Sequence, residues 1–158
     1  MPFNDLLNSN SICIDTTARS KTAVLLKVSQ LLQQNHPHIE VETLFDVFWK
    51  RESLGSTSIG RGILIPHVRM DGVQRAHGCV IKLQYPVDFG AEDKQPIDLV
   101  FGLLVAVHQV DEHLQTLAKI LKHFDNQQFR RACQRVAQHE ELCSLFMNQT
   151  QQSTMAML

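Results

Sequence analysis

Apolar side chains recur every three or four residues at both ends of the chain, a spacing that predicts amphipathic helices there. Residues 17–34 have this period, with Thr16 or Thr17 as the expected N-terminal cap, and residues 40–53 repeat it after a break at Pro37. The period returns in three C-terminal segments, which are predicted to be helices over 110–124, 127–136 and 138–147.

The middle of the chain has shorter apolar runs, which favour strands. Candidates are 63–65, 77–83 and 97–107, and the last is apolar almost throughout, as in a strand that is covered on both faces. Residues 11–14 could be a small strand or an extended arm, and a short strand is expected in the loop before 97. This order predicts one α/β (α+β) domain over residues 1–148, with a mixed, mostly buried sheet flanked by helices. The polar residues 149–158 are expected to form a disordered tail.

Composition and charge narrow the class of protein. The 158-residue chain has 44% hydrophobic and 20% charged residues, the balance of a soluble globular domain. Its net charge of −1 argues against a nucleic-acid partner, which usually meets a clustered basic surface. The dense basic cluster of Arg130, Arg131 and Arg135 is spaced like the solvated face of a helix.

The sequence also lacks the marks of export or membrane insertion. It has no apolar run long enough for a transmembrane helix, no signal peptide and no CxxC pair. We therefore expect a cytoplasmic protein with free cysteines. Apolar neighbours predict buried thiols at Cys13, Cys79 and Cys143.

Pro66 ends the predicted strand 63–65 and is followed by a histidine. Proline has no N–H for a sheet ladder and holds the preceding residue extended, so His67 should project at the rim of the sheet, where ligand sites tend to lie. A neutral imidazole can attack a phosphoryl group through one ring nitrogen when the other nitrogen is held by a hydrogen bond. A histidine after a proline is also often an ordinary turn residue.

Residues on either side of His67 could bind the oxygens of a phosphoryl group. Arg51 or Arg69 could offer a guanidinium fork, although an arginine near a helix end also suits the helix dipole. Ser56 and Thr57 lie in a glycine-rich turn and could supply hydroxyl and N–H groups to phosphate. The turn is not a nucleotide phosphate loop, because an arginine and a glycine replace the lysine and the hydroxyl residue of that motif.

A second histidine, His113, lies at the start of a predicted helix. It shares a line with Leu117, Ile120 and Phe124, so it should point into the body of the protein, and a helix start favours a bound phosphate. The alternative is a partly buried histidine bonded to a backbone carbonyl. His108 is five residues away and not four, so no helical metal pair is expected.

The segment from Arg51 to His67, read as R-E-x-L-G-S-T-x-I-G-x-G-I-x-I-P-H, resembles the signature of phosphotransferase-system IIA domains of the fructose/mannitol type. Ser20-Lys21, the run 95–101 and Glu112-His113-Leu114 are also similar to that family, so the resemblance covers roughly residues 3–147. The chain departs from the family pattern at Ser58, Leu64 and Val68.

The resemblance implies a IIA-type fold and a transient phosphohistidine, without a cofactor. It implies an enzyme only in the sense of protein-to-protein phosphoryl transfer. The phosphorylated histidine of the family, its neighbouring histidine and the arginine of the R-E pair match His67, His113 and Arg51. The implied donor is the histidine-containing phosphocarrier protein or its nitrogen-related paralogue, and the implied accepting atom is Nε2.

Two acceptors are open. With no IIB or membrane IIC part attached, the chain is most similar to the stand-alone nitrogen-regulatory branch of the family, which implies regulated protein partners. The alternative is a IIA component that passes phosphate to a IIB domain for fructose/mannitol-type sugar uptake.

Overall fold

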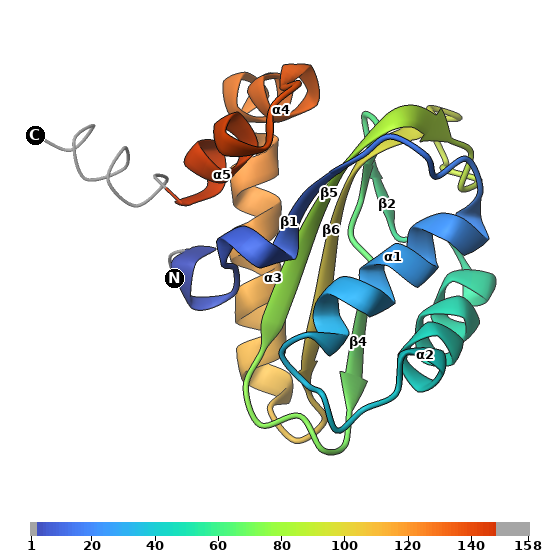
Figure 1. Cartoon of the computed structure of the whole chain (residues 1–158), viewed down its shortest axis with the longest axis vertical. Helices are drawn as coiled ribbons and strands as arrows, with labels where there is room; N and C mark the ends of the chain where they lie inside the picture. Colours follow the sequence, from blue (N-terminus) through green and yellow to red (C-terminus); the bar gives the residue numbers. More distant parts are fainter. Residues whose placement is uncertain (1–2, 148–158) are drawn as a thin grey trace, which may run out of the picture.

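The computed structural model describes residues 3–147, which form a mixed sheet between layers of helices (Figure 1). The predicted polar tail lies outside the described residues. In chain order the elements are the 3-10 turns η1 (Phe3–Asp5) and η2 (Ser9–Ser11), then β1 (Ile12–Asp15), α1 (Lys21–Gln33), α2 (Val41–Leu54), β2 (Ser58–Gly60), β3 (Ile63–Leu64), β4 (His67–Met70), β5 (His77–Val87), β6 (Ile97–Ala106), α3 (Val110–Asp125), α4 (Gln127–Arg135) and α5 (His139–Met147).

Strand β6 is the centre of the sheet. The strand order is β1-β5-β6-β3-β2, and β4 pairs with the same edge of β6 further along, after β3 has ended. β5 runs antiparallel to β6, whereas β3 and β4 run parallel to it and β1 runs parallel to β5. Every residue of β6 except Asp98 is buried, which confirms the prediction of a strand covered on both faces.

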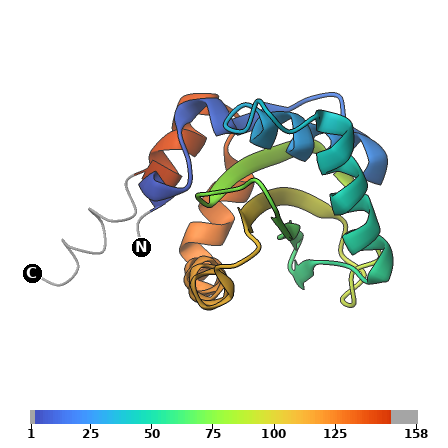
Figure 2. The same ribbon diagram turned by 90° about the horizontal axis from the view of Figure 1, so that it is seen from below.

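Helices cover both faces of the sheet, and each face has its own core (Figure 2). α1 and α2 bring residues such as Leu32 and Phe48 to one face. α3, α4 and α5 cover the other face, where Phe101 of the sheet contacts Phe124 and Phe146. No helix within residues 3–147 is long and apolar enough to cross a membrane.

Helix α1 begins later than its apolar period predicted. The Asp15 carboxylate accepts hydrogen bonds from the N–H groups of Thr17 (2.8 Å) and Ala18 (2.7 Å), so the chain makes a turn there first. Ser20 then caps the helix by accepting a hydrogen bond from the N–H of Ala23 at 3.1 Å. The other helices begin and end within one residue of the predicted bounds.

Arg130 does not lie on a solvated helix face, so the prediction from its spacing was wrong. Its side chain is buried, and its Nη1 donates to the carbonyl oxygen of Phe124 at 2.7 Å. The last carbonyls of α3 have no partner within their own helix, and Arg130 reaches back from α4 to satisfy one of them. Arg131 and Arg135 are exposed as predicted.

The four cysteines are free. Cys79 and Cys133 are buried, and burial raises the pKa of each thiol to about 12, so neither is a reactive thiolate near neutral pH. Cys13 and Cys143, which were also expected to be buried, are only half-buried.

Candidate functional site

Pro66 divides the chain beside β6 into two short strands. β3 ends at Leu64, and β4 begins at His67, which lies opposite Leu103 of β6. The carbonyl oxygen of Pro66 accepts a hydrogen bond from the N–H of Leu103 at 2.9 Å, so the chain stays on the edge of β6 although proline itself cannot donate. His67 is therefore the first residue of a new strand at the sheet edge, and not a loop residue beyond the last strand.

The ring of His67 is oriented by the chain just before it. Its Nδ1 lies 2.7 Å from the carbonyl oxygen of Ile65. A carbonyl oxygen can only accept, so Nδ1 is the donor, and in the neutral ring Nε2 carries the lone pair. The break at Pro66 makes this possible, because Ile65 lies between the two strands. The atom left for chemistry in the half-buried His67 is Nε2.

His113 lies in the first turn of α3, beside His67. The centroids of the two rings are 5.5 Å apart, with an angle of 60° between the ring planes. Nε2 of His113 is buried and has no hydrogen-bond partner among the residues that the structure describes. The inward orientation predicted from the helical line is thus confirmed, whereas a bond from Nε2 to a backbone carbonyl is not found in this part of the chain.

The surroundings of His113 favour its uncharged form. Burial lowers the pKa of His113, and the positive charge that His67 and Arg69 can carry lowers it further. A buried nitrogen without a partner costs roughly 1–3 kcal/mol. The site thus contains, beside His67, a buried nitrogen that is available to a ligand.

Arg51 lies in the last turn of α2, where its Nη1 donates to the carbonyl oxygen of Gly55 at 2.9 Å. This hydrogen bond holds the turn that follows the helix. The structure does not join Arg51 to His67 by a hydrogen bond, but the remaining N–H groups of the half-buried guanidinium are available to a ligand.

Ser56 and Thr57 have different surroundings. Thr57 is buried, and the carboxylate of Glu52 accepts hydrogen bonds from both its N–H (3.0 Å) and its hydroxyl (2.7 Å). The hydroxyl of Ser56 accepts from the N–H of Ser58 at 3.1 Å and keeps its own proton. The hydroxyl proton of Thr57 is already donated, and a part in phosphate binding stays a prediction for both residues.

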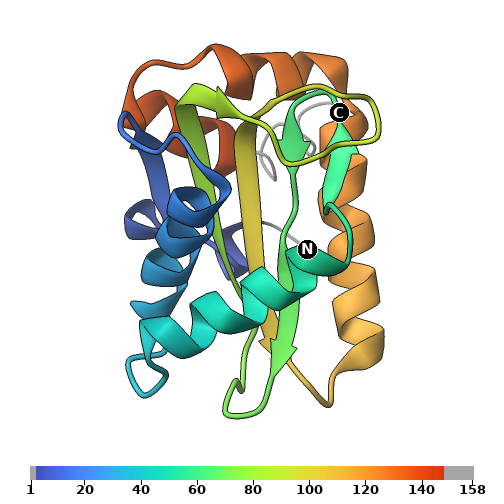
Figure 3. The same cartoon turned by 90° about the vertical axis from the view of Figure 1, so that its right-hand side faces the viewer.

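Exposed apolar side chains occur on the elements that carry the candidate residues. α2 and α3 lie on either side of β4 (Figure 3). Leu54, the last residue of α2, is 85% exposed, and Leu114, next to His113, is 58% exposed. Val110 at the start of α3 is also exposed. Val110 and Leu114 are four residues apart on α3, so these two apolar groups lie on the same side of the helix.

The chain is similar to a known protein family over most of its length. Residues 5–149 match the model of the family described as "Phosphoenolpyruvate-dependent sugar phosphotransferase system, EIIA 2". The chain belongs to this family. The EIIA type-2 domain is a phosphotransfer component of that system, and the family that the sequence resembles is confirmed.

Two curated relatives of this EIIA type-2 chain carry the name "Nitrogen regulatory protein". The relative from Pseudomonas aeruginosa is 36% identical over 128 residues, which cover 81% of this chain and 83% of that protein. The relative from Klebsiella oxytoca is 32% identical over 143 residues, which cover 90% and 88%.

Solved structures confirm the IIA-type fold. The nitrogen regulatory protein IIA-Ntr from Neisseria meningitidis matches with a TM-score of 0.84 and 32% identity, over 91% of this chain and 98% of that one. IIA mannitol from Escherichia coli matches with a TM-score of 0.68 and 22% identity, over 89% and 98%. The second match shows a shared fold only.

The carbonyl of Ile65 is the part of the site that sequence reasoning missed. The carbonyl that holds Nδ1 belongs to the residue before Pro66, and no side-chain motif marks it. The proline was the available signal, because it interrupts the strand and leaves a carbonyl near the following side chain.

Proposed function

We propose that this EIIA type-2 domain accepts a phosphoryl group on Nε2 of His67 from a histidine-containing phosphocarrier protein and regulates partner proteins by its phosphorylation state. The observation that carries the proposal is the hydrogen bond of Nδ1 to the Ile65 carbonyl, which leaves Nε2 as the nucleophile. Nε2 attacks phosphorus while the nitrogen–phosphorus bond of the donor breaks, and the donor imidazole leaves with the electron pair of that bond. Catalysis then consists mainly of in-line positioning and charge stabilisation.

His113 and Arg51 stabilise the charge of the transferred group in this proposal. A phosphoryl dianion close to His113 raises the pKa of that histidine, opposing the effect of burial, so that Nε2 becomes a donor. Arg51 adds a fixed positive charge through the N–H groups that Gly55 does not use. Ser56 and Thr57 contribute to phosphate binding through the turn that follows α2 in this proposal.

Regulation of the nitrogen-regulatory type is supported by the names of the relatives and by the surface around the site. The phosphoryl group adds close to two negative charges beside the start of α3, where Val110 and Leu114 are exposed. A partner that covers these apolar groups would have to desolvate that charge, so phosphorylation is expected to weaken its binding.

The test is phosphorylation by the phosphocarrier protein in the presence of phosphoenolpyruvate and enzyme I, followed by intact mass and by NMR of the phosphohistidine. We expect one phosphoryl group per chain, attached to Nε2. His67→Ala should abolish labelling, and His108→Ala, which removes an exposed histidine before α3, should not change it. Unchanged labelling of His67→Ala would overturn the proposal.

A second arm of the experiment separates the two acceptors. Labelled protein is mixed with a IIB domain of the fructose/mannitol type, and transfer of the label is followed. Retention of the label on His67 supports the regulatory role, and rapid, complete transfer supports sugar uptake instead.

A further inference from the structure

A second polar cavity lies at the opposite end of α3 from His113. Its volume is about 500 Å³, and it is lined by Arg61, Asp125, Gln127, Arg130, Arg131 and Gln134. His113 and Asp125 are twelve residues apart on α3, or roughly 18 Å at 1.5 Å per residue. The cavity is therefore distinct from the phosphorylation site.

The cavity brings three guanidinium groups together with a single carboxylate, that of Asp125. Arg130 and Arg131 come from α4 and Arg61 from the turn between β2 and β3. Within residues 3–147 no carboxylate forms a salt bridge with any of the three. Burial lowers the pKa of Arg130, repulsion from Arg61 and Arg131 lowers it further, and the smaller effect of Asp125 opposes this without reversing it. Like charges held together in this way favour an anion between them.

The hydrogen bonds of Arg130 and Arg131 go to neutral groups. Arg130 donates to the carbonyl oxygen of Phe124. The guanidinium of Arg131 meets the amide oxygen of Gln127 at 2.6 Å, in the amide orientation that satisfies both groups. Both guanidinium groups are thus oriented by neutral oxygens, which fix the side chains without cancelling their positive charge.

Arg61 occupies a position that turn geometry alone would give to glycine. Its φ is +60°, between Gly60 and Gly62, which also have positive φ values. A left-handed conformation costs a residue with a side chain roughly 1–2 kcal/mol relative to its ordinary region. Arg61 thus carries a backbone cost that glycine would not have at this position.

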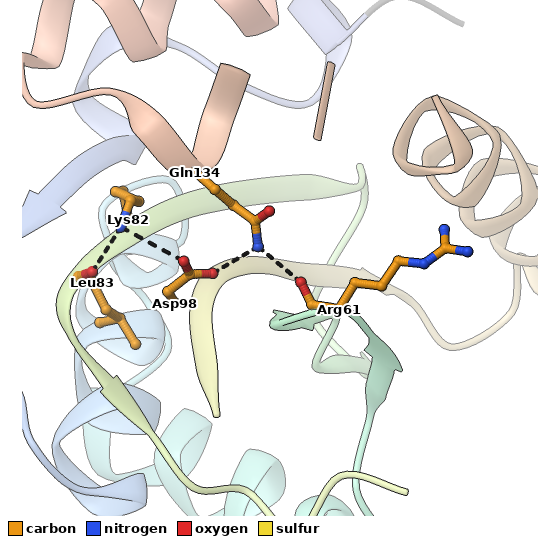
Figure 4. Close-up of polar contacts among 5 residues, drawn as sticks. All are labelled: Arg61, Lys82, Leu83, Asp98 and Gln134. Atoms are coloured by element: carbon orange, nitrogen blue, oxygen red, sulfur yellow. Dashed lines mark hydrogen bonds and ion pairs between the residues drawn. The ribbon is translucent and has the colours of Figure 1, made fainter. Parts of the chain in front are cut away.

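A hydrogen-bond network fixes this turn against α4 (Figure 4). Nε2 of Gln134 donates to the carbonyl oxygen of Arg61 at 2.9 Å and to Oδ1 of Asp98 at 2.8 Å. Asp98 also lies 3.9 Å from Nζ of Lys82 on the neighbouring strand. The guanidinium of Arg61 points away from this network (Figure 4). The backbone of Arg61 is therefore tied to the helix that carries the other two arginines.

We propose that this cavity binds a small phosphorylated metabolite, with the phosphate group held by Arg61, Arg130 and Arg131. Guanidinium groups match phosphate through paired N–H donors, and three of them on two rigidly joined elements form a preorganised site. The volume is in the range of small-molecule sites. The proposal does not depend on phosphoryl transfer at His67.

The experiment is a titration of the full chain with inorganic phosphate and with glucose 6-phosphate, followed by ¹⁵N chemical shifts, with glucose as the uncharged control. We expect saturable shifts at residues 61–62 and 126–134 with both phosphates and none with glucose. Arg61→Gly and Arg131→Gln should each weaken binding by about tenfold or more, whereas Arg135→Gln on the same helix should not change it.

The variants keep the outcome interpretable. Arg61→Gly relieves the positive φ, so the fold is expected to be retained when binding is lost. His67→Ala should bind both probes like the unmodified chain, which separates this proposal from the proposed function. The phosphate site would be refuted if no saturable shift occurred into the millimolar range, or if Arg61→Gly and Arg131→Gln both bound phosphate as tightly as the unmodified chain.

Discussion

Replacing His113 by leucine should slow phosphoryl transfer without destabilising the protein. Leucine keeps an apolar side chain of moderate size on the inner side of α3 and removes the buried nitrogen that has no partner in the described residues. That nitrogen costs roughly 1–3 kcal/mol in the unphosphorylated protein, and leucine is also a better helix former than histidine. Loss of the ring contact with His67, at 5.5 Å between centroids, offsets part of this gain. We expect the free energy of unfolding to be unchanged or higher by about 1 kcal/mol.

The same substitution should slow phosphoryl transfer, although it does not destabilise the fold. One hydrogen bond to a charged group contributes roughly 1.5–3 kcal/mol, and 1.36 kcal/mol corresponds to a tenfold change in rate. His113→Leu should therefore accept phosphate about 10- to 150-fold more slowly. Rapid-quench measurement of labelling by the phosphocarrier gives the rate, and urea unfolding gives the stability.

The dependence of stability on pH provides a third measurement. Burial lowers the pKa of His113 in the folded state, so protonation of this histidine favours the unfolded protein. The stability that the uncharged His113 contributes is therefore fully present above the unfolded pKa of about 6.5 and is lost as pH falls through the folded pKa. His113→Leu should remove the part of the decrease in stability at low pH that His113 causes. A normal transfer rate combined with a large loss of stability would show that His113 is only a packing residue, and His108→Leu serves as the exposed control.

Three further predictions concern the scaffold. Thr57→Val leaves an oxygen of the buried Glu52 carboxylate without its 2.7 Å hydrogen bond, and urea unfolding should show a loss of about 1.5–3 kcal/mol. Nδ1 of His77 and Nε2 of His36 are 2.8 Å apart, and burial lowers the pKa of both residues. The free energy of unfolding should therefore fall as pH drops below about 6.5. The double variant His36→Gln/His77→Asn should flatten this dependence in unfolding curves between about pH 8 and 5. Gly102→Ala on β6 would place a Cβ 2.8 Å from Sγ of Cys79 on β5 and 2.8 Å from Cγ1 of Val28 on α1. We expect a loss of about 1–3 kcal/mol in thermal unfolding, and an unchanged melting temperature would refute the packing argument.

Local patterns predicted those features that depend on local physics. The continuous apolar run of β6 needs cover on both faces wherever the strand lies, so its burial could be predicted from the sequence. His113 shares its helical line with Ile120 and Phe124, and both of these are buried in the fold. That line sufficed to orient the histidine before any tertiary contact was known.

The features that sequence reasoning missed depend on contacts between distant segments or on backbone atoms. Arg130 was placed on a solvated face because its partner is a backbone carbonyl at the end of the preceding helix, which has no sequence signature. Asp15 competes with the helix for the N–H groups of the residues that follow it, and this delays α1. The pairing of His36 with His77 joins residues far apart in the chain, and only the folded sheet brings them together.

The position of His67 on a paired strand limits how a phosphoryl group there can be sensed. β4 is held in register along β6 from His67 opposite Leu103 to Met70 opposite Ala106, so its main chain has little freedom to rearrange. Modification of His67 would then change the charge at one edge of the protein and leave its shape nearly constant. A partner that distinguishes the two forms must touch that edge directly. If the proposed function holds, two such partners should compete for that edge with each other and with the phosphate donor.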